Sequence, residues 1–170
     1  CFADEYMEET VKTPGKSMEY DYFQDEFLPK IKNAPIINFM GGEPTLHPRF
    51  NDIFQNTYDS ILPFSHLSVF TNGLMPDRVL DLLLKIASPS GAHSKQITFA
   101  ILLNWQTMEN ISEKNHERCK EVAERMLKVN GYSVTFSINL YSKNQDLEKQ
   151  CEEINTVYQK AGLPRDKQYK

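Results

Sequence analysis

The residues best suited to chemistry lie in one short stretch, Gly41-Gly42-Glu43-Pro44. An apolar run with β-branched residues at positions 36–40 precedes the glycines and predicts a buried strand that ends in a turn. Glycines adopt positive φ without strain and let backbone N–H and C=O groups approach a ligand. Pro44 restricts the backbone of Glu43 and should aim its carboxylate. One carboxylate beside exposed backbone suits a small cation such as an α-ammonium group. A solvated glutamate at an ordinary strand exit is the alternative interpretation.

The rest of the chain alternates strand and helix patterns around this stretch. Apolar runs at 36–40, 67–70, 97–103 and 134–140 predict four strands. Their starts recur at about the length of one βαβ unit, which favours a parallel sheet. The run at 97–103 has almost no alternation and is typical of a strand covered on both faces. Glu43 would project from the carboxyl edge of such a sheet, where parallel α/β folds bind ligands.

Five helices are expected, one before the first strand and one after each strand. Pro29 should kink the first helix or shorten its last turn, because proline lacks an N–H and crowds the preceding turn. Pro48 and Pro76 suit the starts of the next two helices, and Gly131 marks the end of the fourth. The predicted inward faces are, in chain order, Tyr20, Phe23, Phe27 and Ile31; Phe50, Ile53, Phe54, Thr57 and Ile61; Val79, Leu80, Leu83, Leu84 and Ala87; Cys119, Val122, Ala123, Met126 and Leu127; and Leu147, Cys151, Ile154, Tyr158 and Ala161.

Length and composition predict a single globular domain spanning residues 1–170. The chain is 40% hydrophobic and 25% charged, with a net charge of −4. This acidic balance disfavours bulk binding of nucleic acid. No apolar run approaches the roughly 20 residues that cross a bilayer, so no membrane association is expected. The three cysteines lie far apart, which fits a reducing compartment and predicts a cytoplasmic protein.

Three segments, in this order, resemble those of radical S-adenosylmethionine (radical SAM) enzymes. The most specific is Gly41-Gly42-Glu43-Pro44-Thr45-Leu46-His47-Pro48, which is similar to the segment after the second strand of that family. Cys1-Phe2-Ala3-Asp4 precedes it, and Val69-Phe70-Thr71-Asn72-Gly73 follows one strand later. In the family, the Gly-Gly-Glu-Pro backbone and carboxylate hold the amino group of the cofactor. The resemblance therefore implies that Gly41, Gly42, Glu43 and Pro44 bind S-adenosylmethionine.

The resemblance also implies a [4Fe–4S] cluster. In the family, three cysteines spaced Cys-x3-Cys-x2-Cys bind three irons, and the fourth iron takes the amino and carboxylate groups of S-adenosylmethionine. Thiolates suit iron because they are soft, strongly donating ligands. Cys1 looks like the third of these cysteines, and Phe2 beside it is expected to contact the cofactor. The other two would lie upstream, so the chain is expected to be part of a longer protein and inactive as given.

The family's reaction begins when an electron donor such as flavodoxin or ferredoxin reduces the cluster. Cleavage of S-adenosylmethionine then yields a 5′-deoxyadenosyl radical, which abstracts hydrogen from a substrate. The substrate here is unknown, a peptide or a small molecule. The family's fold is a six-unit, partly open barrel. The resemblance therefore implies an α/β chain that forms a partial (βα)6 TIM-like barrel of parallel strands, with the first strand and the sixth unit missing.

The chain departs from the family pattern at two strands. Leu102 stands where a small polar residue often meets the cofactor's ribose, which leaves Asn104 and Thr71 as the candidates for that contact. The Gly-x-Ile-x-Gly pattern near the adenine is also missing. These departures leave a second hypothesis open: a non-catalytic barrel relic that binds a nucleoside-like ligand or a partner protein. A generic α/β interaction domain is a third.

Other residues with chemical potential lack a supporting pattern. The histidines at 47, 66, 93 and 116 have no metal-binding spacing and are expected at the surface or as caps. Cys119 and Cys151 are expected to be small buried hydrophobes on helix faces. Trp105 and Tyr141 follow strands and are expected to close a barrel rim, or else to line a substrate cavity. The charged residues at 148–153 are expected to form a solvated helix face.

Overall fold

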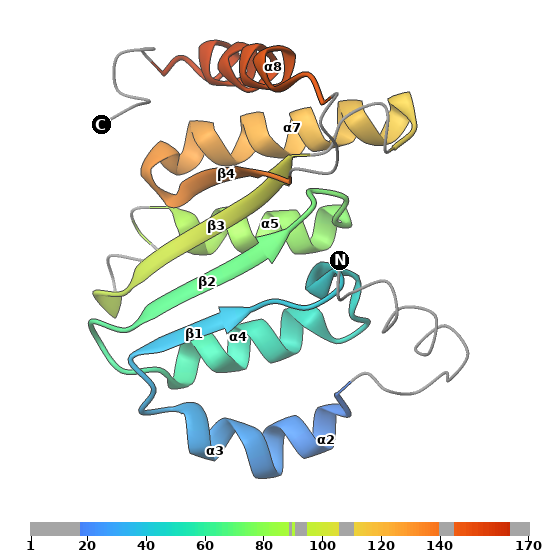
Figure 1. Ribbon diagram of the computed structural model, residues 1–170. Helices are drawn as coiled ribbons and strands as arrows, with labels where there is room; N and C mark the ends of the chain where they lie inside the picture. The colour runs from blue at the N-terminus through green and yellow to red at the C-terminus, as the bar shows by residue number, and fades with distance from the viewer. Residues whose placement is uncertain (1–17, 89, 91–94, 106–110, 140–144, 164–170) are drawn as a thin grey trace.

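Four parallel strands form one sheet in the part of the chain that the computed structural model describes, residues 18–88, 90, 95–105, 111–139 and 145–163. The strands are β1 (Ile36–Phe39), β2 (His66–Thr71), β3 (Thr98–Trp105) and β4 (Val134–Ile138), and they pair in chain order (Figure 1). Every pairing is parallel, with Ile36 opposite His66 and His66 opposite Thr98. The predicted α/β class and parallel sheet are confirmed. Closure into a barrel, or part of one, is a finer arrangement that this sheet does not establish.

The helical segment before β1 is continuous but changes its winding. It consists of α2 (Tyr20–Tyr22), a π-helical turn η1 (Phe23–Phe27) and α3 (Leu28–Ile31). Pro29 lies directly after the π turn, whose widening accommodates a residue that lacks an N–H and crowds the carbonyl four positions back. The kink predicted at Pro29 therefore takes the form of a π turn. One consequence is that Phe23 is buried whereas Phe27, expected on the same inward face, is exposed.

The four remaining long helices begin close to the predicted positions. They are α4 (Phe50–Ser60), α5 (Asp77–Ala87), α7 (Glu113–Asn130) and α8 (Leu147–Lys160). Two short 3₁₀ helices, η2 (Pro44–Leu46) and η4 (Gly131–Ser133), lead into α4 and β4. The side chain of Ser112 caps α7 by accepting a hydrogen bond from the N–H of Asn115, and Asp146 caps α8 in the same way through Lys149.

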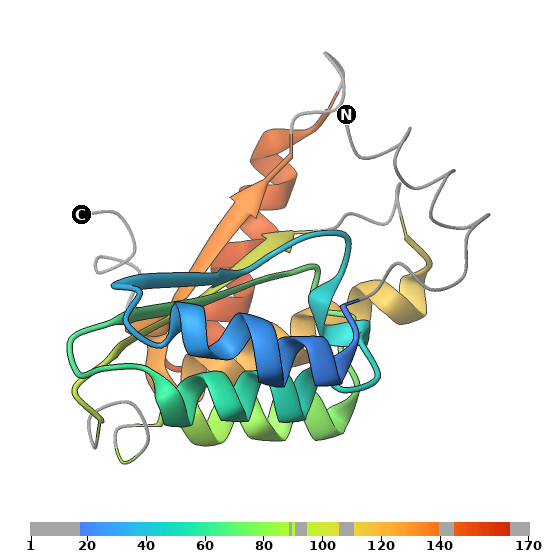
Figure 2. The same ribbon diagram turned by 90° about the horizontal axis from the view of Figure 1, so that it is seen from below.

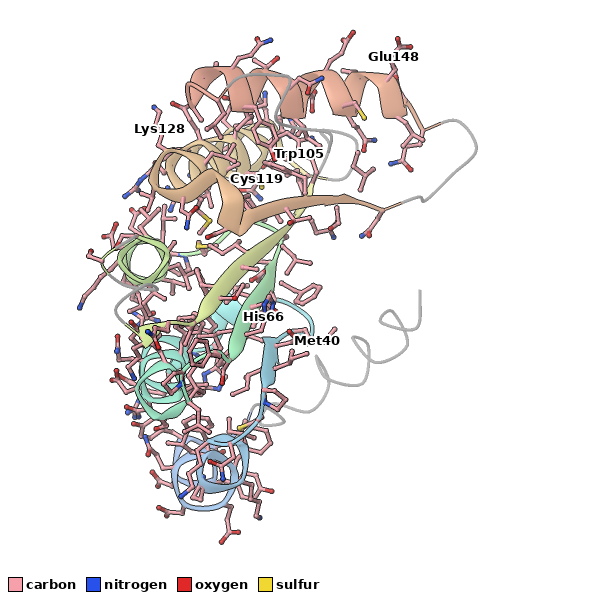
Figure 3. The ribbon with its side chains drawn as sticks, turned by 90° about the vertical axis from the view of Figure 1, so that its left-hand side faces the viewer. Met40, His66, Trp105, Cys119, Lys128 and Glu148 are labelled. Carbon is pink, nitrogen blue, oxygen red and sulfur yellow. The ribbon has the colours of Figure 1, made fainter. Side chains whose placement is uncertain are left out.

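The described helices all lie on one side of the sheet. Figure 2 shows α2–α3, α4 and α5 together beneath the strands, and Figure 3 shows the helices stacked in chain order along one side. Consecutive helices touch one another from α4 to α8. Met40 points away from this layer in Figure 3 and is exposed. The sheet therefore has a helix-covered face and a face that carries no described helix, called the open face below.

Strand β3 shows the two faces clearly and corrects one expectation. The apolar run at 97–103 was predicted to be covered on both sides, but burial alternates along β3. Phe99, Ile101, Leu103 and Trp105 are buried beneath the helices, whereas Ala100 and Leu102 are only half-buried on the open face. Residues of period two point to opposite faces of a sheet. The apolar character of Ala100 and Leu102 therefore does not come from burial under a helix.

The hydrophobic core lies between the sheet and the helices. Phe54 is fully buried at its centre, with its ring near those of Phe39, Phe50 and Phe99. The residues predicted to face inward on α4 and α7 are buried, and Tyr58 of α4 and His116 of α7 are buried beside them. Leu84 of α5 is half-buried, and Ile86 takes its place in the core. None of the described helices is long and apolar enough to span a membrane.

Candidate functional site

The two glycines after β1 form an exposed turn. Gly41 has a φ of 143°, a conformation that L side chains rarely adopt. A Cβ atom built on either Gly41 or Gly42 would have no heavy atom within 4 Å. Within the described residues, the backbones of these two glycines make no hydrogen bond. Their N–H and C=O groups are therefore accessible to a ligand, as the sequence predicts.

Glu43 does not point into solvent but turns toward the end of β2. Its Oε1 atom accepts hydrogen bonds from the hydroxyl of Thr71 at 2.9 Å and from the N–H of Thr45 at 3.2 Å, and also from the Thr45 hydroxyl. Its Oε2 atom accepts one hydrogen bond, from the N–H of Asn72 at 2.7 Å. A carboxylate oxygen has two lone pairs, so Oε2 retains one acceptor position. The carboxylate thus joins the Gly-Gly-Glu-Pro turn directly to the Thr-Asn-Gly turn.

The Thr-Asn-Gly turn after β2 is itself held in place. The Thr71 hydroxyl accepts a hydrogen bond from the N–H of Gly73 at 3.1 Å, and the Asn72 side chain accepts one from the N–H of Leu74 at 2.9 Å. Gly73 has a φ of 79°, and a Cβ atom there would lie 3.2 Å from Cδ2 of Leu103. Glycine is needed at this position both for the backbone angle and for the close packing.

Cys119 ties the same turn to helix α7. Its thiol donates a hydrogen bond to the carbonyl oxygen of Asn72 at 3.0 Å, and the side chain is 2% exposed. Burial, reinforced by the negative charge of Glu43, raises the pKa of the Cys119 thiol to about 11. The thiol is therefore protonated at neutral pH and acts as a donor. The prediction that Cys119 is buried is confirmed, but its hydrogen bond gives it a role beyond packing.

A hollow of about 550 Å³ lies beside the glycine turn, between β1 and the start of α4. Phe39, Phe50 and Ile53 supply apolar lining, and Gly41, Gly42 and Glu43 supply the polar rim. The hollow gives a ligand at the glycine backbone an apolar neighbour.

The open face of the sheet carries polar uncharged and apolar side chains together with His66. Its register places Asn38 beside Ser68, and the hydroxyl of Ser68 donates a hydrogen bond to the Asn38 side chain. Asn104 lies at the end of β3, opposite Ser137 of β4. The strand residues on this face include no Asp, Glu, Lys or Arg; they are Ile36, Asn38, His66, Ser68, Phe70, Thr98, Ala100, Leu102, Asn104, Thr135 and Ser137.

The residues predicted to contact a ribose therefore lie on different faces. Asn104 is on the open face and half-buried, where a ligand at the carboxyl edge could reach it. Thr71 is on the covered face, 3% exposed, and its hydroxyl both donates to Glu43 and accepts from Gly73. Any contribution of Thr71 to cofactor binding would pass through Glu43.

The sequence pattern does not indicate a second cluster of polar side chains, which lies between α7, α8 and the end of β3. His116, expected at the surface, is fully buried in α7, with its ring edge-on to that of Trp105. Glu153 of α8 lies 3.4 Å from Nε2 of His116 and accepts a hydrogen bond from the Trp105 indole at 3.2 Å. Trp105 is thus a core residue rather than a rim residue, and Glu153 is not part of a solvated face. Cys151, expected to be buried on α8, is instead exposed.

The periodicity of α8 could have indicated this arrangement. The buried residues of α8 are Gln150, Ile154 and Val157, and Glu153 lies one position before Ile154 on the same side. The prediction instead placed Leu147 and Cys151 on the inward face. That choice is rotated by about one position from the observed face and turns Glu153 toward solvent. The inward face was assigned from the apolar residues Leu147 and Cys151, although the polar Gln150 is the buried residue, at 4% exposed.

Two of the predicted site residues, Cys1 and Phe2, lie outside the described residues, as does Tyr141. Among the residues that are described, no three His, Cys, Asp or Glu side chains gather closely enough to hold a metal ion. His47 lies just before α4, where its Nδ1 atom accepts a hydrogen bond from the N–H of Arg49, but α4 has no side-chain cap.

Comparisons with protein-family models, curated protein sequences and solved structures found no match for this chain.

Proposed function

We propose that this chain is part of the core of a radical SAM enzyme that binds a [4Fe–4S] cluster and S-adenosylmethionine. The observation that carries the proposal is the direct contact between two of the three resembling segments. Glu43 of the Gly-Gly-Glu-Pro segment accepts hydrogen bonds from Thr71 and Asn72 of the Thr-Asn-Gly segment. Both segments lie at the carboxyl edge of a parallel sheet, where α/β folds bind ligands.

The glycine turn fits the amino group of S-adenosylmethionine. An ammonium group needs acceptors, and the backbone carbonyl groups of the exposed Gly41 and Gly42 can provide them. Among the described residues, Oε2 of Glu43 accepts one hydrogen bond, so it can take a further donor. Pro44 begins the 3₁₀ helix that fixes the backbone behind Glu43. In this proposal backbone carbonyls carry most of the recognition, and the Glu43 carboxylate mainly holds the turn.

The remaining residues have supporting roles. Cys1 would ligate one iron of the cluster, and Phe2 would contact the cofactor beside it. Asn104, on the open face, is the candidate for a ribose contact. When bound and reduced, the cluster and S-adenosylmethionine supply a 5′-deoxyadenosyl radical that abstracts hydrogen from the substrate. The chain's own residues bind and orient the cofactor.

The proposed architecture is a partial (βα)6 barrel. Helices on one side only, an open opposite face and unpaired outer edges at β1 and β4 among the described residues are what a segment of a barrel wall requires. The missing first strand would pair with β1, and a sixth unit would extend the sheet past β4. The proposal includes a cytoplasmic location, an electron donor such as flavodoxin or ferredoxin, and a substrate that is a peptide or a small molecule.

Cluster assembly tests this proposal. The full-length protein and its Cys1→Ala variant would be incubated anaerobically with iron and sulfide, and bound iron and acid-labile sulfide measured. The expected result is about four irons and four sulfides per wild-type chain and a much smaller amount in the variant. Equal, low iron and sulfide contents in both proteins would contradict the proposal.

A second candidate is a non-catalytic relic of the barrel that binds a nucleoside-like ligand. It is favoured by Leu102, an apolar, half-buried residue on the open face where the family often has a polar one. The relic would bind adenosine-containing ligands without a cluster. Tight binding of S-adenosylhomocysteine by a protein that assembles no cluster would favour it.

A further inference from the structure

The glycine turn after β1 lacks packing of its own, so something else must fix its shape. A Cβ atom on Gly41 or Gly42 would meet no heavy atom within 4 Å, and within the described residues their backbones make no hydrogen bond. The turn is attached at one end to β1 and at the other to Glu43. Because Glu43 is bound through its side chain, its carboxylate is the second anchor of the turn.

Both oxygens of the Glu43 carboxylate accept hydrogen bonds from residues outside the Gly-Gly-Glu-Pro segment. The Thr71 hydroxyl donates to Oε1 at 2.9 Å and the N–H of Asn72 donates to Oε2 at 2.7 Å. Hydrogen bonds to an ionised acceptor are stronger than those between neutral groups. These two donors belong to adjacent residues, so a shift of the β2 turn would move both bonds together.

The β2 turn is in turn positioned by helix α7. The Cys119 thiol donates to the carbonyl oxygen of Asn72 at 3.0 Å, and a Cβ on Gly73 would lie 3.5 Å from both Cα and Sγ of Cys119. Thr71 is 3% exposed and Cys119 2% exposed, so neither can itself touch a ligand at the glycine turn. A continuous chain of contacts runs from α7 through Asn72 and Glu43 to Gly42.

We infer that Thr71 and Cys119 are positioning residues for the Gly41-Gly42 backbone, an inference that rests on the proposed function for its cofactor readout. They set where the backbone carbonyls lie and so the affinity for the ammonium group of S-adenosylmethionine. The raised pKa of Cys119, about 11, is consistent with this role because the S–H donor persists throughout the neutral range.

The test uses the full-length, reconstituted protein and measures the KM for S-adenosylmethionine and kcat separately. Thr71→Val keeps the shape of the side chain but removes the hydroxyl, which donates to Glu43 and accepts from the N–H of Gly73. Loss of the charge-assisted hydrogen bond to Glu43 is expected to raise KM about tenfold. Thr71→Ser should restore KM. Cys119→Ala should raise KM about threefold because a thiol is a weak donor, and Cys119→Ser should reverse most of that increase.

Thr57→Val is the matched control. Thr57 is also fully buried, and its hydroxyl donates to the carbonyl of Ile53 within α4, away from both turns. This variant loses a comparable hydrogen bond, so it should lower stability without changing KM. A KM that is unchanged in folded Thr71→Val and Cys119→Ala, or raised equally in Thr57→Val, would overturn the inference.

Amide hydrogen exchange of the cofactor-free protein provides a readout that does not depend on the proposed function. Peptides covering residues 40–45 should exchange faster in Thr71→Val and Cys119→Ala than in the wild type, Thr71→Ser or Thr57→Val. If the wild type cleaves no S-adenosylmethionine, the proposed function fails, and the exchange result alone decides whether Thr71 and Cys119 position the turn. If Thr71→Val does not fold, Cys119→Ala decides by the same two readouts.

Discussion

Removing the carboxylate of Glu43 should destabilise the protein even when no ligand is present. Four hydrogen bonds end on this group, from the N–H and hydroxyl of Thr45, the hydroxyl of Thr71 and the N–H of Asn72. In Glu43→Ala all four donors lose their acceptor. The free energy of unfolding should fall because buried donors without partners are costly.

The size of the effect follows from the burial of the donors. Thr45 is 0% and Thr71 3% exposed, so their two hydroxyls count in full, at about 1–2 kcal/mol each, whereas water can partly replace the acceptor at the backbone of Asn72. The expected loss is about 2–4 kcal/mol. For a protein of this size it corresponds to a fall in Tm of about 5–15 °C.

Urea and thermal unfolding followed by circular dichroism measure this loss. Glu43→Gln should give an intermediate value, since its amide presents a second N–H group where Asn72 already donates. Glu152→Ala is the control, at an exposed glutamate of α8 whose side chain makes no hydrogen bond or ion pair among the described residues. It should change stability by less than about 0.5 kcal/mol. A Glu43→Ala protein as stable as this control would show that the carboxylate is solvated and would refute the structural tie.

Four further predictions concern the same region and the core. Gly73→Ala should lower the free energy of unfolding by about 1–3 kcal/mol, and by more than Gly41→Ala does. Both glycines have positive φ, but of the two only Gly73 has a neighbour, Leu103, 3.2 Å from the added Cβ. Equal losses in chemical denaturation would contradict this packing. Iodoacetamide at pH 8 should alkylate the exposed Cys151 but not Cys119, because a pKa of about 11 leaves about one Cys119 thiol in a thousand ionised. Mass spectrometry of the digested protein measures the labelling at each cysteine. The pKa of the Cys119 thiol is raised above its usual 9, so the protonated thiol stabilises the folded protein. This contribution to the free energy of unfolding should be complete below pH 9 and lost as the pH rises through 11. A Cys119→Ala protein whose stability falls in the same way at alkaline pH would disprove this. Phe54→Ala should cost about 3–5 kcal/mol, measured by urea unfolding, because the ring is fully buried among three other phenylalanines; a loss below about 1 kcal/mol would show that this core is loosely packed.

Periodicity predicted the sheet well because the covered faces of its strands and helices are strongly apolar. The four strands, their parallel pairing and the apolar inward residues of α4 and α7 follow from spacing. The errors occurred where an apolar residue is exposed or a polar one is buried, as His116 is in α7. Ala100 and Leu102 are apolar but lie on the open face, and Cys151 is exposed because Gln150 takes the inward position on α8.

The candidate site was predictable in its parts but not in its connections. The exposed glycine turn follows from Gly41-Gly42 and the residues before it. That Glu43 would turn toward Thr71 and Asn72, and not toward solvent, depends on the register of β1 with β2, which the sequence does not give. The contact between Cys119 and Asn72 spans 47 positions and depends on how α7 packs behind β2. Sequence spacing carries no signal for such a contact.

Cofactor cleavage by the full-length, reconstituted protein tests the proposed function most directly. Anaerobic incubation with a strong reductant and S-adenosylmethionine should yield 5′-deoxyadenosine and methionine in equal amounts, quantified by mass spectrometry. Recovery of intact S-adenosylmethionine, from a protein that has assembled its cluster and is fully reduced, would contradict the proposal.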